Sequence, residues 1–270
     1  MAINPGYAGA EEALSTTIVQ RGQWRGIENA PATITFAAHA LFKNKHTGFG
    51  MLLSNDKIGV HRDLTALANY AFHLKTGKSS FLSMGIQAGL HHKRSDYSSL
   101  IDPLLQDPKI SEATLTNTFF DVGAGIYFRS ERWHAGLSAP QILPENIVVN
   151  DTASFRFSRT NFFAFLKHRI SITESIDLEP AGLLKYFYGT PLSFDLTLNT
   201  IFYQALTFGI SYRKSESVDF LLRGQITPQL AFGYSYDYPV GDIQQLSNGS
   251  HELMVHYVFR YVQKNTVSPR

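Results

Sequence analysis

The chain has 270 residues, of which 44% are apolar, 13% aromatic and only 17% charged, and its formal net charge is +2. Soluble domains usually carry about 25% charged residues, so this composition indicates a protein with much surface that does not face water. The near-neutral charge gives no support to nucleic acid as a partner. Cysteine is absent, which excludes disulfides and thiolate metal sites.

The sequence has no apolar run of about 18 residues, so no transmembrane helix is expected. A chain that spans a membrane without helices must form a closed β-barrel, because lipid offers no partners for backbone amides and carbonyls. Alternation of apolar and polar residues is the dominant pattern. It runs through 81–90, 120–128, 206–214 and 230–238, each with one apolar face.

The polar faces of these segments consist of small residues rather than of lysine and glutamate. In 206–214, for example, Leu206, Phe208 and Ile210 alternate with Thr207 and Gly209. A soluble barrel places large apolar residues inside and long charged residues outside. Here the aromatic and aliphatic residues form the outside, which is typical of a transmembrane outer-membrane barrel. We therefore predict an all-β fold of about 14 antiparallel strands.

Fourteen strands are expected in chain order. They cover 15–25, 32–42, 48–56, 62–75, 79–92, 118–129, 132–140, 155–172, 175–189, 192–204, 206–214, 217–227, 229–238 and 250–261. An even number is the rule for bacterial barrels, and strands of about ten residues are long enough to cross the hydrocarbon. The segment 175–189 has the weakest alternation, because Pro180 and Lys185 interrupt it.

The connections predict the orientation of the barrel. Long connections follow the fifth, seventh and thirteenth strands, whereas the connections after even-numbered strands are tight turns. Long loops at one end and short turns at the other are typical of outer-membrane barrels, with the short turns on the periplasmic side. Residues 1–270 are thus expected to form one barrel domain, with 1–14 as a periplasmic lead-in and 262–270 as a polar tail.

The predicted inner face contains glycines, which weaken strands and therefore need a reason. They are Gly85, Gly89, Gly123, Gly125, Gly136, Gly209 and Gly233. They either leave space in the lumen or let another backbone approach closely. A fourteen-strand barrel encloses more volume than small side chains fill. Water, a folded-in loop such as 92–117, or a bound segment is expected to occupy that volume.

The residues give no enzymatic site. The ten histidines are dispersed, and the chain lacks a G-x-S-x-G motif. We therefore assign no catalytic residue, no metal site and no cofactor. Tyrosines cluster toward strand ends, where they could stack on nucleic acid or sugar. An aromatic girdle at the membrane interface is the favoured interpretation.

Short motifs stand in a fixed order along the chain, and their most specific residues are Asn4, Pro5, Tyr7, Ala8, Gly9, Arg21, Gln23, Trp24, Gly26, Pro31, Asp56 and Gly59. These motifs resemble those of the PorP/SprF family, outer-membrane proteins of the Bacteroidetes type IX secretion and gliding-motility machinery. The resemblance covers essentially the whole chain. Gly6 stands where the family usually has alanine.

The resemblance implies a non-enzymatic outer-membrane barrel whose partners, besides outer-membrane lipid, are other proteins. Some family members associate with the periplasmic ring of the secretion machine. Others pair with large secreted adhesins, whose C-terminal sorting domains they help to export or anchor. A channel or porin for small solutes is the alternative. A barrel hydrolase, which would need a Ser/His or Asp/His pair at the outer rim, is the third class.

The resemblance also implies a signal peptide, which is missing before Met1 in this sequence, so a trimmed or misassigned start is expected. For the motif residues, structural roles are favoured over partner contact. Arg21 and Asp56 could form an ion pair in the lumen, and Trp24 could belong to the girdle. Asn4 and Pro5 are expected to shape the turn before the first strand.

Overall fold

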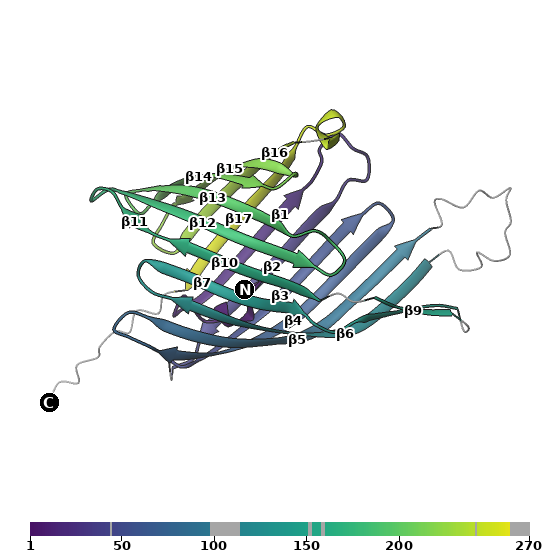
Figure 1. Cartoon of the computed structure of the whole chain (residues 1–270), viewed down its shortest axis with the longest axis horizontal. Coiled ribbons are helices and arrows are strands. Elements are labelled where there is room, and N and C mark those ends of the chain that lie inside the picture. The colour runs from purple at the N-terminus through teal and green to yellow at the C-terminus, as the bar shows by residue number, and fades with distance from the viewer. Residues whose placement is uncertain (44, 98–113, 151–152, 158–159, 241, 260–270) are drawn as a thin grey trace, which may run out of the picture.

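The structure, a computed structural model, describes residues 1–43, 45–97, 114–150, 153–157, 160–240 and 242–259. One antiparallel sheet dominates it and runs in the order β10-β7-β6-β5-β4-β3-β2-β1-β17-β16-β15-β14-β13-β12-β11. A pairing between β10 and β12 closes the sheet. The result is a closed barrel of 14 antiparallel strands, because the two-residue β11 only extends the line of β10 beside β12 (Figure 1). Among the described residues, no helix is long and apolar enough to cross a bilayer.

The fourteen barrel strands are β1 Leu14–Gly22, β2 Ala32–Leu41, β3 Thr47–Ile58, β4 His61–Lys75, β5 Phe81–Asp96, β6 Thr114–Arg129, β7 Trp133–Gln141, β10 Asn161–His168, β12 Ile176–Phe187, β13 Ser193–Phe202, β14 Leu206–Arg213, β15 Ser217–Gln225, β16 Leu230–Pro239 and β17 Ser250–Phe259. Outside the barrel wall lie η1 Pro5–Tyr7, β8 Glu145–Asn150, β9 Ala153–Phe157, β11 Ile170–Ser171 and η2 Asp242–Gln245.

The structure confirms that the large apolar side chains of the strands face outward and the small polar ones face the lumen. On β14, Phe208 and Ile210 are half exposed on the outside, whereas Ser211 is buried on the inside and shares a hydrogen bond with Thr197 at 2.8 Å. Most of the fully buried side chains are polar and face the lumen, among them Ser83 and Asp121. The wall is therefore built to contact lipid outside and polar groups inside.

The strand count and the tight turns after even-numbered strands are confirmed. The eighth predicted strand, 155–172, is wrong as a single element. Its first part is β9, which pairs with β8 in a separate two-stranded sheet. Its second part is β10, which begins at Asn161 opposite Gln141, the last residue of β7. The other neighbour, β12, ends at the same level, with Phe187 opposite Asn161. The wall therefore offers no pairing partner before Asn161, and the alternating sequence divides there.

The weakly alternating segment 175–189 does form a strand, β12. Its proline lies where the hydrogen-bonded pairing with the neighbouring strand is interrupted. β10 pairs with β12 up to Ala181, and β11 resumes the pairing at Leu178. Pro180 falls between the two, where the missing amide proton costs no ladder hydrogen bond on that side.

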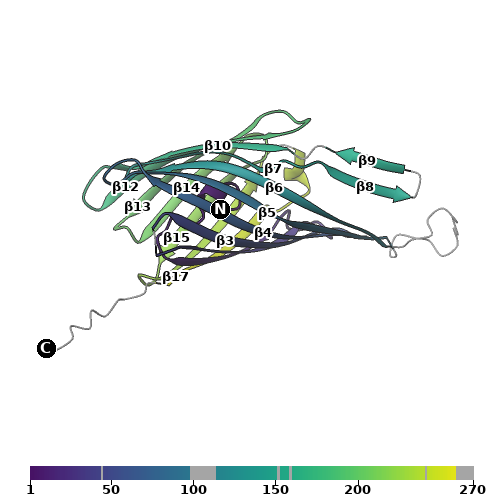
Figure 2. The same ribbon diagram turned by 90° about the horizontal axis from the view of Figure 1, so that it is seen from below.

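The two ends of the barrel differ in their connections. Tight turns join the strands at one end, and at the other end the β8–β9 hairpin extends beyond the barrel (Figure 2). The loop expected at 92–117 is shorter than predicted, because β5 continues to Asp96 and β6 begins at Thr114. Residues 98–113 lie outside the described residues. The expected polar tail, 262–270, also lies outside them.

Residues 1–14 were expected as a periplasmic lead-in, but residues 1–13 lie inside the barrel and Leu14 already belongs to β1. The N-terminus is seen within the ring of strands in both views (Figures 1 and 2). η1 packs against β4, β5 and β6 from the lumen. The chain then passes the end of the barrel that carries the short turns and enters β1 at Leu14. We call residues 1–13 the N-terminal segment.

Candidate functional site

The candidate site is the contact between the N-terminal segment and the lumenal wall. Its centre is the single turn Pro5–Tyr7, which Asn4 caps by accepting a hydrogen bond from the Gly6 amide at 2.9 Å. The side-chain amide of Asn4 also donates to the carbonyl of Ile126 in β6, again at 2.9 Å. Asparagine and proline are favoured at these cap and first-turn positions. One side chain therefore both forms the turn and binds it to the wall.

Two histidines of the wall hold the second half of the segment. His73 Nε2 donates to the carbonyl of Ala8 at 2.8 Å, and its Nδ1 accepts from the Ser83 hydroxyl at 2.6 Å. His39 Nδ1 accepts from the Gly9 amide at 3.2 Å. His73 is 1% exposed. Buried backbone groups need such partners, so these bonds replace the water that would otherwise solvate the segment.

Glycines of the wall let the segment approach as closely as one backbone can approach another. A Cβ atom on Gly85 would lie 2.2 Å from the Gly6 nitrogen, and one on Gly48 would lie 2.0 Å from the Ala8 oxygen. Water, a folded-in loop and a bound segment were the expected occupants of the lumen. The structure shows that the chain's own N-terminal segment lies there. Gly125 and Gly136 leave room for the Asn4 side chain in the same way.

Tyr7 and Glu11 complete the contact. The Tyr7 ring packs edge-on against His39 and Tyr127, with ring centroids 5.4 and 5.3 Å apart, and its hydroxyl donates to Glu11 at 3.0 Å. The other Glu11 oxygen lies 3.3 Å from His256 Nε2. Burial alone would raise the pKa of Glu11, but hydrogen bonds and the nearby histidines outweigh it and lower the pKa to about 2.

The lowered pKa of Glu11 predicts how docking of the segment depends on pH. Above pH 4.5, the ordinary pKa of this carboxyl, its ionised form contributes fully, and the contribution is lost as the pH falls from 4.5 toward 2. A nitroxide on Ala2→Cys should therefore show increasing mobility by electron paramagnetic resonance across this range. Glu11→Gln should remove that dependence. The same acid-induced mobility in Glu11→Gln would contradict the role of Glu11.

The remaining motif residues lie at the other end of the barrel, around the first loop. Arg21 forms ion pairs with Asp237 and with Glu252, the latter at 3.3 Å, rather than with Asp56 as its expected partner. Asp56 instead accepts a hydrogen bond from the Thr33 hydroxyl at 2.7 Å. The reason is register: Arg21 lies directly opposite Glu252 on β17, whereas Asp56 lies two strands away on β3.

Backbone contacts hold the loop between β1 and β2. The Trp24 amide donates to the Ser250 hydroxyl at 3.2 Å, and the carbonyl of Pro31 accepts from the amide of Gln23 at 2.9 Å. The amide of Gly59, in the tight turn after β3 with φ +57°, donates to the Asn29 carbonyl at 2.9 Å. The twelve motif residues thus belong to two places. The N-terminal segment contains Asn4, Pro5, Tyr7, Ala8 and Gly9, and the opposite end contains Arg21, Gln23, Trp24, Gly26, Pro31, Asp56 and Gly59.

Sequence reasoning missed the wall residues that receive the segment. They are His39, His73, Ser83, Tyr127 and Ser138, the last of which donates to the Ile3 carbonyl. Their positions on the inward face were readable from the alternation, but their partners were not. Within the described part of the chain, no group of three His, Cys, Asp or Glu side chains could hold a metal ion.

Comparison with known proteins agrees with this architecture. The fold is similar to that of the CymD monoaromatic hydrocarbon channel, with a TM-score of 0.53 at 8% identity over 96% of this chain and 92% of that one. It is also similar to the Acinetobacter baumannii outer membrane protein Omp33, with a TM-score of 0.50 at 9% identity over 92% and 99%. No curated protein matches the sequence.

The barrel fold and a family match place the protein in the outer membrane as an integral protein. The family model described as "Type IX secretion system membrane protein PorP/SprF" matches residues 1–257. Together with the motif residues at both ends of the barrel, this match means that the chain belongs to the PorP/SprF family.

Proposed function

We propose that this barrel is a non-enzymatic binding protein of the type IX secretion machinery. It binds a secreted adhesin and helps to export or anchor it, or it couples the machine to the outer membrane. The observation that carries the proposal is the lumen itself. Its wall is fitted to a polypeptide segment by glycines at backbone distance and by histidines that bond to the segment's backbone.

The opposite end of the barrel supports a protein partner as well. The β8–β9 hairpin extends beyond the wall there (Figure 2), and the base of β8 is bound to the barrel through Glu145, which accepts from Lys93 at 2.8 Å. A projecting two-stranded element offers a surface to a macromolecule rather than to a small solute.

Serine–histidine pairs occur, but their settings favour binding over hydrolysis. Ser83 bonds to His73 and is fully buried, so no substrate can reach its hydroxyl. At the rim with the long loops, His61 Nδ1 lies 2.7 Å from Ser95 Oγ. The other contact of His61 among the described residues is with an aromatic ring, so no carboxylate orients it as in a catalytic triad.

The experiment that tests the proposal is affinity purification of the tagged protein from native outer membranes in mild detergent. We expect secreted proteins of the type IX pathway, or periplasmic components of the machine, to copurify. A variant without the hairpin residues 146–156 should lose the secreted protein while remaining a folded barrel. Recovery of neither class above the level found with an unrelated barrel would contradict the proposal.

A channel for small solutes remains the second candidate, because cavities are left beside the segment. One of about 620 Å³ lies between residues 10–13 and the wall at the end with the short turns. Conductance of the intact chain, unchanged by removal of the segment, would favour this alternative.

A further inference from the structure

The N-terminal segment covers one side of the lumen and leaves the other side uncovered. Its contacts are mainly with β2 to β7, and Glu11 also reaches His256 on β17. Beside the segment lie three cavities of about 620, 380 and 330 Å³, each bordered by β15 and β17. One side chain, Arg223 of β15, lines all three. The three cavities thus meet at a single guanidinium group.

Arg223 is a cation without a protein counter-ion. Its side chain is exposed to the lumen, and no hydrogen bond or ion pair joins it to any other described residue. The carboxylates that line these cavities have other partners, and Glu11, which lines two of them, lies 3.3 Å from His256 Nε2. Glu179 lies 3.2 Å from Lys167 and 3.6 Å from Arg169, and Glu12 lies 2.6 Å from Arg129. Glu252 is paired with Arg21. The cavity of about 330 Å³ therefore has an excess of positive charge at Arg223.

The space beside this guanidinium is partly apolar. Gly233 lies directly opposite Arg223 on β16, where it leaves a gap that Met254 borders. Ile201 and Leu221 line the same cavity. A cavity of about 150 Å³ can hold a benzene ring, so a ring-sized body and its charged group fit here.

We propose that Arg223 and the cavities around it form a binding site for a monocarboxylate with an apolar body. The guanidinium supplies the two parallel donors that match a carboxylate, and the apolar wall receives the rest of the ligand. Access is from the end with the short turns, because Pro228 and Gln225 at the last of these turns line the largest cavity. That end faces the periplasm in outer-membrane barrels.

The carboxylate could belong to a small solute or to the C-terminus of a peptide, and both present the same chemistry to Arg223. The site is tested separately from the function proposed above, because it lies away from the hairpin, although the N-terminal segment borders two of its cavities.

Calorimetry on the full chain in detergent tests the site, with sodium benzoate and its neutral analogue benzyl alcohol as probes. Benzoate should bind and benzyl alcohol should not. Arg223→Gln should weaken benzoate binding by about tenfold or more, the usual effect of losing a charge-assisted hydrogen bond. Arg223→Lys should retain part of the affinity, because it keeps the charge but loses the paired donors. Arg25→Gln, which removes an exposed charge in the loop after β1, is the matched control and should bind normally.

A dipeptide with a free C-terminus, compared with its amide, distinguishes the sources. Tighter binding of the free dipeptide than of benzoate would assign the site to a peptide terminus, and benzoate binding alone would assign it to a solute. Equal binding of benzoate by Arg223→Gln, equal binding of the neutral analogue, or no binding of either carboxylate would overturn the proposal.

Discussion

Gly85→Ala is expected to expel the N-terminal segment from the lumen while leaving the barrel folded. The new Cβ would lie 2.2 Å from the Gly6 nitrogen and 2.4 Å from the Pro5 carbonyl carbon. Both are backbone atoms, which cannot turn aside as the end of a side chain can. Overpacking of this kind costs about 1–3 kcal/mol, enough to shift a docked segment largely to its undocked state.

The chain has no cysteine, so a single Ala8→Cys substitution gives a clean reporter for this experiment. Ala8 is fully buried in the docked segment. Maleimide labelling should be slow in the parent and roughly tenfold faster or more in Gly85→Ala, as the overpacking cost requires. Gly22→Ala is the control, because a Cβ there meets no atom within 4 Å. Equal labelling rates in the two glycine variants would refute close packing at Gly85.

Arg21→Met should lower the free energy of unfolding by about 3 kcal/mol, because it leaves carboxylates without their main cation. Asp237 is the most affected, since its side chain is only 5% exposed. Arg213 lies 3.9 Å from the same carboxylate and retains part of the compensation. Urea unfolding in lipid vesicles measures the change.

Two further variants separate the pairing from the volume of the side chain. Arg25→Met, in the exposed loop, should leave the stability unchanged. The double variant Arg21→Met with Asp237→Leu should recover most of the loss, because removing both partners leaves less unpaired charge buried. A double variant as unstable as Arg21→Met alone would show that packing rather than charge accounts for the effect.

The barrel was predictable from sequence because its evidence is local and repeated. Each strand has its own alternation, as in Phe208 and Ile210 against Ser211, and fourteen repeats of the pattern give the strand count. The division of 155–172 was not predictable, since alternation continues through β9 and β10. What sets the start of β10 is the end of its neighbour β7 at Gln141, which the sequence of β10 does not contain.

The candidate site was predictable only in part. The motif residues Asn4, Pro5, Tyr7 and Gly9 were identified, and the inner glycines predicted that something approaches the wall closely. The identity of the occupant was not predictable, because it depends on contacts between residues far apart in the chain, such as Asn4 with Ile126. The ion pairs of Arg21 depend in the same way on which strands become neighbours when the barrel closes.

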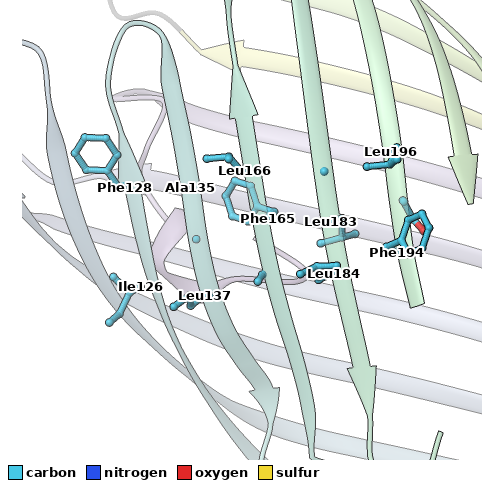
Figure 3. A pocket seen from close by; sticks show the side chains of 14 residues that line it. Ile126, Phe128, Ala135, Leu137, Phe165, Leu166, Leu183, Leu184, Phe194 and Leu196 are labelled. Carbon is cyan, nitrogen blue, oxygen red and sulfur yellow. The ribbon is translucent and has the colours of Figure 1, made fainter. Parts of the chain in front are cut away.

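The barrel also has a groove on its outer surface, and small side chains on three neighbouring strands account for it. Small residues stand among leucines on the lipid-facing side of β7, β10 and β12, namely Ala135, Ala164 and Gly182, and they leave a hollow of about 670 Å³ (Figure 3). Its walls are almost wholly apolar, as in the side chains of Leu137 and Leu166 that border it. Such a surface suits the hydrocarbon of the bilayer.

The central claim is that the N-terminal segment occupies the lumen and narrows it, and single-channel recording in planar bilayers tests it most directly. The full chain should show a smaller conductance than a chain without residues 1–13, which should show large, stable stepwise openings. Equal conductance of the two chains would contradict the account, because the segment would then not be what obstructs the barrel.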